Sequence, residues 1–236
     1  MNTSILQRLP DDIAVEITRK DIRTLRLSVH APDGRVKVSA PVAMPEAFIS
    51  AFVLDRLGWI RKHQLRLAAR HEQPACRYAD GEHHWFSGRR YVLKVIERQA
   101  PARVALGDDS LVLQVRPGAS AEQRRALLDA WYRRYLKAAL PSLIAGHQPR
   151  MGVQVQAFGV KRMKTRWGSC NPRARRIWLN LELARAPSEC LEYVVVHEMV
   201  HLLERRHNTR FHALMDRFLP GWREHKDRLN SLPLRF

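Results

Sequence analysis

The segment His197 to His201, with the sequence HEMVH, carries the residue types and spacing best suited to chemistry in this chain. On an α-helix, residues four apart lie nearly above one another, so both imidazoles would leave one face about one turn apart. This spacing suits two ligands of one metal ion. Glu198 projects from a neighbouring edge, where its carboxylate can reach a metal-bound water without being a ligand. Because zinc lowers the pKa of such a water to about 7, the pattern predicts hydrolysis with Glu198 as general base.

The residues around this segment predict that it lies on a buried helix. Apolar side chains recur at helical spacing at Leu191, Val194, Val195, Met199, Leu202 and Leu203. Histidine and glutamate are costly to bury without a partner. Their presence on such a helix therefore needs a reason, and metal binding supplies one.

A third metal ligand is expected, because a catalytic zinc keeps three protein ligands and one open position. His207 is the first candidate, but a continuous helix would rotate it away from His201. The pair Asn208–Thr209 predicts the N-cap of a new helix, so a turn between two helices can return His207 to the metal. Glu224 is the alternative ligand, and the affinity of imidazole for zinc favours His207. The new helix would continue through Phe211, Leu214, Met215, Phe218 and Leu219 and stop at Pro220–Gly221.

Further motifs surround this site: KTRWGSC at residues 164–170, IWLN at 177–180, YVVVHE at 193–198, and His207–Asn208 with Phe211. With them the chain resembles the YgjP-like family of predicted zincin metallopeptidases. The resemblance is close over residues 150–222 and extends more loosely through 38–41, 59–60 and 87–91. It implies a SprT-like zincin core in which His197, His201 and His207 bind one Zn²⁺ per chain and Glu198 is the catalytic base. Other divalent transition metals remain alternatives, because histidine accepts several of them.

Two positions depart from the family pattern. Met199–Val200 stand where Leu-Ala or a similar pair is usual, which is a conservative change. His212 occupies a position that is commonly tryptophan. It is either an exposed helix residue or a group on the substrate side of the site.

The resemblance also implies that Arg166, Trp167 and Gly168 line the substrate cleft. Zincins commonly place an edge strand beside the metal, where a peptide can add as a further strand. A glycine at position 168 would let another backbone approach closely. Arg166 would polarise a substrate oxygen or hold an anionic group, and its alternative is a structural ion pair. Trp167 is a cleft residue or a core residue.

The composition describes a basic globular protein. Its 236 residues include 41 Lys and Arg against 23 Asp and Glu, a formal net charge of +18, and 45% of them are hydrophobic. Such a charge favours anionic partners and nonspecific nucleic-acid association, although no zinc finger or RNA-binding motif accompanies it. Cys76, Cys170 and Cys190 lack C-x-x-C spacing, so a reducing compartment is expected, and Cys170 is either near the metal or a buried thiol. With no signal peptide and no long apolar run, we expect a cytoplasmic protein without a membrane partner.

The pattern along the chain predicts an α+β fold with a β-rich, antiparallel amino-terminal lobe over residues 1–118 and a zincin-like lobe over 119–236, which together could form one continuous domain. Alternating segments predict strands at 13–17, 25–29 and 35–38, forming a hairpin or meander through the turn Pro32–Gly34. An amphipathic helix is predicted over 46–71, and a hairpin turns at Ser87–Gly88, followed by a strand at 111–115.

A helix from Ser120 or Ala121 to about Ala145, kinked or ended by Pro141, would pack against the metal-bearing helix. Strands are predicted near 153–155, 163–169 and 177–181, and no internal repeat is visible.

Three functions are compatible with these features. The first is a zinc metallopeptidase that acts on a peptide or protein. The second keeps the metal and the water but cleaves a nucleotide phosphoanhydride, with arginines neutralising the phosphates. The third is a DNA-associated basic protein with a metal site; a purely structural zinc would need four protein ligands, and three are found.

Overall fold

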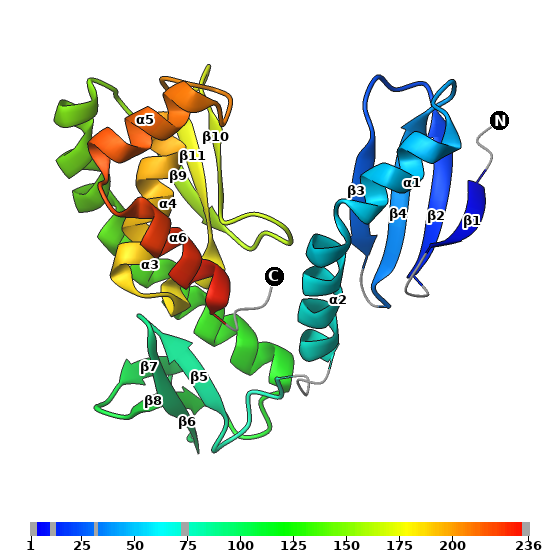
Figure 1. The fold of residues 1–236 in the computed structure, drawn as a ribbon. Coiled ribbons are helices and arrows are strands. Elements are labelled where there is room, and N and C mark those ends of the chain that lie inside the picture. Colours follow the sequence, from blue (N-terminus) through cyan, green and yellow to red (C-terminus); the bar gives the residue numbers. More distant parts are fainter. Residues whose placement is uncertain (1–3, 10–12, 31–32, 72–75, 233–236) are drawn as a thin grey trace. The chain divides into compact units, whose positions relative to one another are not determined.

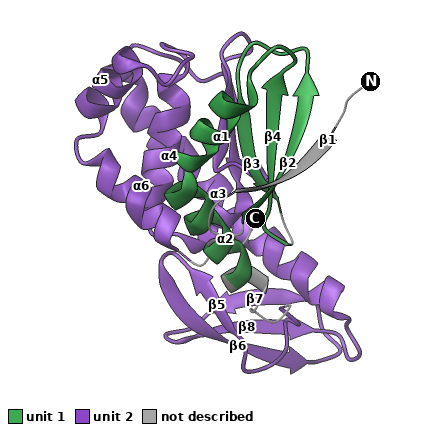
Figure 2. Ribbon diagram, turned by 45° about the vertical axis from the view of Figure 1, so that its right-hand side comes forward, with its two compact units in different colours: residues 1–75 green, residues 76–236 purple. Residues whose placement is uncertain are grey.

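A computed structural model describes residues 4–9, 13–30, 33–71 and 76–232 of the protein. The chain divides into two compact units, residues 1–75 and 76–236, which Figure 2 colours separately. The first unit contains one sheet and the second contains two, and each unit has its own core, so each is described by itself.

The first unit contains a four-stranded sheet in the order β1-β2-β4-β3 (Figure 1). Its strands are β1 Ser4–Leu9, β2 Ile13–Lys20, β3 Arg26–His30 and β4 Arg35–Pro41. The outer pairs are antiparallel as predicted, but the central pair, β2 and β4, is parallel. The β3–β4 hairpin therefore forms and a simple meander does not, because β3 lies on the far side of β4. Gly34 makes part of the hairpin turn with φ of 71°, while Pro32 lies outside the described residues.

Two helices follow this sheet where the sequence predicts one helix over 46–71. They are α1 Glu46–Leu54 and α2 Leu57–His71. Between them the Arg56 N–H donates to the Val53 carbonyl, which tightens the last turn of α1, and Gly58, a poor helix former, follows. Ile49, Val53 and Ile60 are the helix residues that close the core over the sheet.

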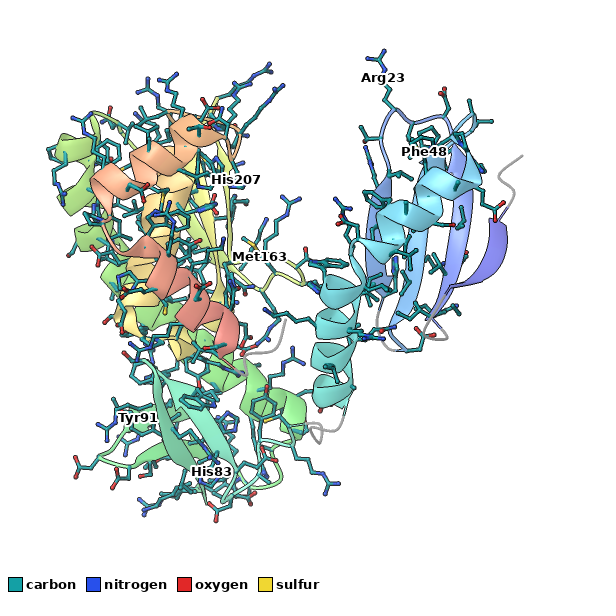
Figure 3. All side chains as sticks on the ribbon, in the orientation of Figure 1. Arg23, Phe48, His83, Tyr91, Met163 and His207 are labelled. Carbon is teal, nitrogen blue, oxygen red and sulfur yellow. The ribbon has the colours of Figure 1, made fainter. Side chains whose placement is uncertain are left out.

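Two apolar residues of these helices do not face that core. Phe48, labelled on α1 in Figure 3, is 68% exposed, and Leu65 is 71% exposed. The sequence pattern places both on the apolar face, so this part of the prediction is wrong. The break at Asp55–Arg56 changes which helix positions meet the sheet.

The second unit begins with another four-stranded sheet, in the order β5-β6-β8-β7. Its strands are β5 His83–Phe86, β6 Arg89–Glu97, β7 Arg103–Leu106 and β8 Ser110–Val115. The predicted turn at Ser87–Gly88 is confirmed: both residues have positive φ, 46° and 79°, which suits a two-residue hairpin. The N–H groups of this turn donate to the carbonyls of Ala184 and Arg185. Strand β7 is not predicted from the sequence.

Helix α3 spans Ala121–Met151 and starts at a capping box in which Ser120 and Gln123 bond each other's backbone N–H groups. The sequence predicts a helix that ends at about Ala145, with Pro141 kinking or ending its last turns. The predicted length is wrong, because α3 continues to Met151. A proline removes one helix hydrogen bond, but Pro141 and Lys137, whose carbonyl loses its partner, are both exposed, so water can replace that bond. Leu136, Leu140 and Ile144 are buried on the inner face and keep the helix against the core.

A three-stranded sheet with the order β10-β11-β9 follows, made of β9 Ala157–Lys161, β10 Gly168–Asn171 and β11 Arg176–Asn180. The predicted strand at 153–155 does not form, because the Val155 N–H donates to the Gln148 side chain instead of a strand. The strand predicted from Met163 starts only at Gly168, because the Asn180 side chain holds both backbone groups of Met163.

The chain ends with a 3₁₀ helix η2 Leu181–Arg185 and three α-helices, α4 Ser188–Val200, α5 Thr209–Phe218 and α6 Trp222–Ser231. Helix α4 packs against α3, α5, α6 and the strands β10 and β11 (Figure 1). The packing of α3 against α4 agrees with the prediction, whereas α6 is not predicted.

The boundary between the units lies after residue 75, not after 118 as the sequence suggests. The physical reason is the core: Leu93, Leu111 and Leu113 of the second sheet belong to the cluster that includes α3 and α4. The predicted α+β fold is confirmed. No helix in the described part of the chain is both long and apolar enough to cross a membrane.

Candidate metal centre

Helix α4 carries the first three candidate residues. Val195, Val196, Met199 and Val200 are fully buried, so the helix is fixed on several sides, as its apolar pattern predicts. His197 and His201 lie one turn apart with ring centroids at 5.0 Å. His201 is the C-cap residue of α4. The chain can therefore turn after it and bring the third candidate ligand, His207, back toward the other two histidines.

His207, labelled in Figure 3, lies in the turn between α4 and α5. The Asn208 side chain accepts the N–H of Phe211 at 3.0 Å, which confirms the predicted N-cap of α5. The Nε2 atom of His207 is 3.0 Å from Nε2 of His197. One ligand atom from each of His197, His201 and His207 lies within 4.8 Å of the others.

Phe211, on the first turn of α5, contacts all three imidazoles. Its ring centroid lies 5.0 Å from His197, 4.8 Å from His201 and 4.6 Å from His207. The side chain is 1% exposed, so it cannot move without opening the core. Phe211 therefore holds the three rings in their relative positions.

The surroundings of the cluster favour the neutral form of two of its rings, His197 and His207. Burial, with the charges of His201 and His207, lowers the pKa of His197 to about 3, and burial and His201 lower the pKa of His207. Nδ1 of His201 lies 3.0 Å from the Glu204 carbonyl, which can only accept, so Nδ1 donates and the Nε2 side of the ring is left for a metal ion. Neutral imidazoles oriented by a backbone carbonyl are the usual ligands of zinc. The donor set therefore fits a metal ion.

Glu198 lies beside this cluster and is 4% exposed. Burial raises the pKa of its carboxyl to about 8, while the charge of Arg166 acts in the opposite direction. Its Oε2 atom is buried and has no hydrogen-bond partner among the described residues. An orphaned carboxylate oxygen next to three imidazoles is available to a water molecule or a substrate.

Gly168, the first residue of β10, lies against that carboxylate. A Cβ atom at this position would lie 2.5 Å from Oε1 of Glu198 and 2.8 Å from its Cγ. Real Cβ atoms do not approach other atoms this closely, so any other residue at position 168 would force the Glu198 side chain to move. The sequence predicts that another backbone approaches Gly168 closely. In the structure, the group that lies close to Gly168 is the side chain of Glu198.

The cluster opens into a cavity of about 880 Å³. One wall is the segment 165–173, which contains β10, and the other is α4 with its following turn. Strand β10 is an edge strand, because it pairs with β11 alone in the order β10-β11-β9. Of the described residues lining the cavity, Arg166, Arg173 and Arg205 are cationic and Glu198 carries the carboxylate.

Several other predicted site residues also line this cavity. Arg166 is exposed and forms none of the ion pairs found among the described residues, which removes the alternative of a structural ion pair there. Its carbonyl accepts a hydrogen bond from the buried side chain of Asn180, which fixes the segment before β10. Trp167 is both a cavity and a core residue, since it lines the cavity and packs against the main cluster. Cys170 lines the cavity as a half-buried free thiol, whose pKa is raised to about 11 by burial and by Glu198.

Two candidates lie elsewhere. Glu224 is in the first turn of α6. Among the described residues, it belongs neither to those that line the cavity nor to the histidine cluster. His212 is half-buried and stacks on Trp222, with ring centroids 5.7 Å apart and an interplanar angle of 6°. It is therefore neither a freely exposed residue nor part of the cavity wall.

Sequence reasoning misses Tyr193, Arg173 and Arg205. Tyr193 lies one turn before His197, lines the cavity and is 7% exposed. Burial raises its pKa to about 12, so the phenol keeps its proton and can donate a hydrogen bond. Its spacing of four residues from His197 could have revealed it, whereas nothing in the sequence distinguishes the two arginines from the other basic residues.

A comparison with known protein families gives a match over most of the chain. The profile of the YgjP-like metallopeptidase domain matches residues 23–232. The match defines a metallopeptidase domain, and a metallopeptidase requires a metal cofactor. The chain belongs to the YgjP-like family, as the sequence motifs indicate.

One solved structure is similar to part of the chain. The crystal structure of the metallopeptidase zymogen abylysin from Pyrococcus abyssi is 20% identical, with a TM-score of 0.36, and the match covers 39% of this chain and 91% of that one. No curated protein matches the sequence.

Proposed function

We propose that the protein is a zinc peptidase in which His197, His201 and His207 hold the ion and Glu198 is the general base. The observation that supports this most is the geometry of one ligand atom from each histidine, all within 4.8 Å, beside the orphaned Glu198 carboxylate. The chemistry that a bound zinc supplies is a lowered pKa of water and polarisation of the scissile carbonyl.

The residues of the chain divide the remaining work. The Glu198 carboxylate accepts the proton of the attacking water and passes it to the leaving amine. Its burial makes it a stronger base than an exposed glutamate, in agreement with its raised pKa. The protonated phenol of Tyr193, which lines the same cavity, would donate a hydrogen bond to the substrate oxygen that gains negative charge.

The substrate backbone would pair with the free edge of β10. An extended peptide that adds to an edge strand gains main-chain hydrogen bonds along its length. The cavity lies along this strand, so a peptide bound there would pass the Glu198 carboxylate. Arg166, Arg173 and Arg205 would then contact its side chains or termini.

The test is peptide hydrolysis by the zinc-loaded protein and its Glu198→Gln variant. Glutamine has the same shape but cannot accept the proton, so we expect a loss of at least about 100-fold in kcat with zinc content and folding unchanged. Glu224→Gln is the matched control and should keep full activity. A Glu198→Gln protein as active as the wild type would contradict the assignment.

The second candidate function is hydrolysis of a nucleotide phosphoanhydride at the same site. The observation that favours it is the lining of the cavity by three arginines with one carboxylate. Guanidinium groups bind phosphate oxygens through paired hydrogen bonds. Release of phosphate or pyrophosphate from a panel of nucleoside triphosphates distinguishes the two functions. No release from any of them with several metals would eliminate phosphoanhydride hydrolysis.

A further inference from the structure

A second cluster of metal-ligand side chains lies at the beginning of the second unit, away from the histidine site. Cys76 is the first residue of that unit, Glu82 directly precedes β5, and His84 lies within β5. The Cys76 thiol donates to Oε2 of Glu82 at 3.1 Å. Nε2 of His84 lies 3.6 Å from the Cys76 sulfur and 3.6 Å from the same Glu82 oxygen.

These three atoms form the face of a coordination tetrahedron. Zinc bonds of about 2.3 Å to sulfur and about 2.0 Å to nitrogen and oxygen, at tetrahedral angles, separate the ligand atoms by about 3.3–3.6 Å. The observed separations of 3.1, 3.6 and 3.6 Å differ from these values by a few tenths of an ångström at most. We propose that Cys76, Glu82 and His84 bind a second zinc ion, with water in the fourth position.

The loop that carries two of the ligands is held in place. The N–H groups of Arg77 and Tyr78 each donate to the Glu82 carboxylate at 2.9 Å, one to each oxygen. Tyr78 and Gly81 have positive φ, 54° and 81°, which curls the chain back between Cys76 and Glu82. Cys76 is therefore returned to His84 by a tight loop, and the ligands are arranged before any ion arrives.

His84 brings a buried imidazole to the cluster. The residue is 3% exposed, so its ring has little access to water. Its Nε2 atom is hydrogen-bonded to the Cys76 sulfur at 3.6 Å and lies at the same distance from the Glu82 oxygen, so the ring already faces the two other proposed ligands. Burial and the charge of Arg185 lower the pKa of this histidine to about 4, which leaves the neutral ring that a metal requires.

The charges around the cluster are compatible with a cation. A thiolate and a carboxylate together balance the two charges of zinc, so the loaded site is neutral. Arg185 is the neighbouring cation, but its Nη1 pairs with the buried carboxylate of Glu182 at 3.1 Å. Burial and Glu82 raise the pKa of the Cys76 thiol without an ion, so zinc binding must release a proton and weaken as the pH falls.

Cobalt(II) is the probe that separates the two sites. Cobalt bound by a thiolate has a charge-transfer band in the near ultraviolet, whereas a site made of three histidines has none. Metal-free full-length protein is titrated with cobalt while the band and the number of bound ions are recorded. We expect two ions per wild-type chain with the band, and one ion without the band for Cys76→Ser.

Two further variants make the result decisive. Cys170→Ser removes the thiol that lines the main cavity and should keep both the second ion and the band. His197→Ala disables the histidine site and should keep the band with one ion, so failure of the proposed peptidase site is seen separately. Absence of the band in the wild type, its survival in Cys76→Ser, or its loss in Cys170→Ser would each overturn the second zinc site.

Discussion

The two four-stranded sheets of this protein have the same topology. The strand order β1-β2-β4-β3 of the first unit repeats as β5-β6-β8-β7 in the second. In both, the outer pairs are antiparallel and the central pair is parallel, with six matched residue pairs in each parallel ladder. The chain thus contains one supersecondary arrangement in two positions.

The sheets differ in what their buried faces support. The first is closed by Ile49, Val53 and Ile60 into a small core of its own. The second contributes to the core that contains α3 and α4, and its hairpin turn at Ser87–Gly88 bonds the carbonyls of Ala184 and Arg185 just before α4. The same arrangement therefore forms a separate unit in one position and helps to support the helix that carries the proposed metal ligands in the other.

The largest expected effect comes from Phe211, which lies in the core of the second unit and touches the three imidazoles. We expect Phe211→Ala to reduce stability by about 3–5 kcal/mol and to lower zinc affinity, because the rings lose the side chain that positions them. Phe218→Ala, in the same helix and 5% exposed, is the control that should lower stability without a specific loss of affinity. Denaturant unfolding and zinc titration measure both. Equal zinc affinities in the two variants would show that Phe211 has no positioning role.

The comparison of the two sheets is tested by a matched pair of core truncations. Leu93 in β6 and Ile49 in α1 are both fully buried. Each change to alanine should cost about 2–5 kcal/mol in its own unit. Only Leu93→Ala should also reduce peptidase activity and zinc retention, because only its core continues to α4. A loss of zinc in Ile49→Ala would break the distinction between the units.

Gly168→Ala is expected to have a smaller effect on the stability of the protein and a local effect on the position of the catalytic base. The added Cβ would collide with Oε1 and Cγ of Glu198, so the carboxylate must leave its position. We expect kcat to fall by roughly 10- to 100-fold while zinc content is unchanged, since a displaced base of about 1 Å costs about this much. Full activity in this variant would mean that the position of Glu198 is not critical.

The smallest effect is a stabilisation. Gly146 lies inside α3, and a Cβ there would meet no atom within 4 Å. Gly146→Ala should raise stability by about 0.5–1 kcal/mol, because alanine loses less backbone entropy in a helix. Gly58, also in open space but in the first turn of α2, should gain less when changed in the same way. Thermal unfolding of the two variants checks the order.

Local signals in the sequence predict the histidine cluster well. The four-residue spacing of His197 and His201 and the cap at Asn208 are properties of neighbouring residues, and the structure has the helix, the turn and the second helix accordingly. Contacts between distant residues are not predicted in this way. The parallel pairing of β6 with β8 and the collision that requires Gly168 depend on tertiary packing. The repeated topology is also invisible, since the two halves share no sequence motif.

Helix α3 shows how packing overrides a local signal. Proline predicts an interruption at position 141, but the inner face of the helix buries Leu136, Leu140 and Ile144. The lost hydrogen bond is on the exposed face, where water can replace it. A sequence cannot show which side of a helix will face solvent at a proline until its neighbours are known.

The central claim, a zinc site made of His197, His201 and His207, is tested most directly by the zinc content of the wild type, His207→Ala and Glu224→Ala, purified identically. We predict that His207→Ala loses one zinc per chain relative to the wild type and that Glu224→Ala loses none. If Glu224→Ala loses the zinc, or if His207→Ala retains all of it, the three-histidine site is wrong.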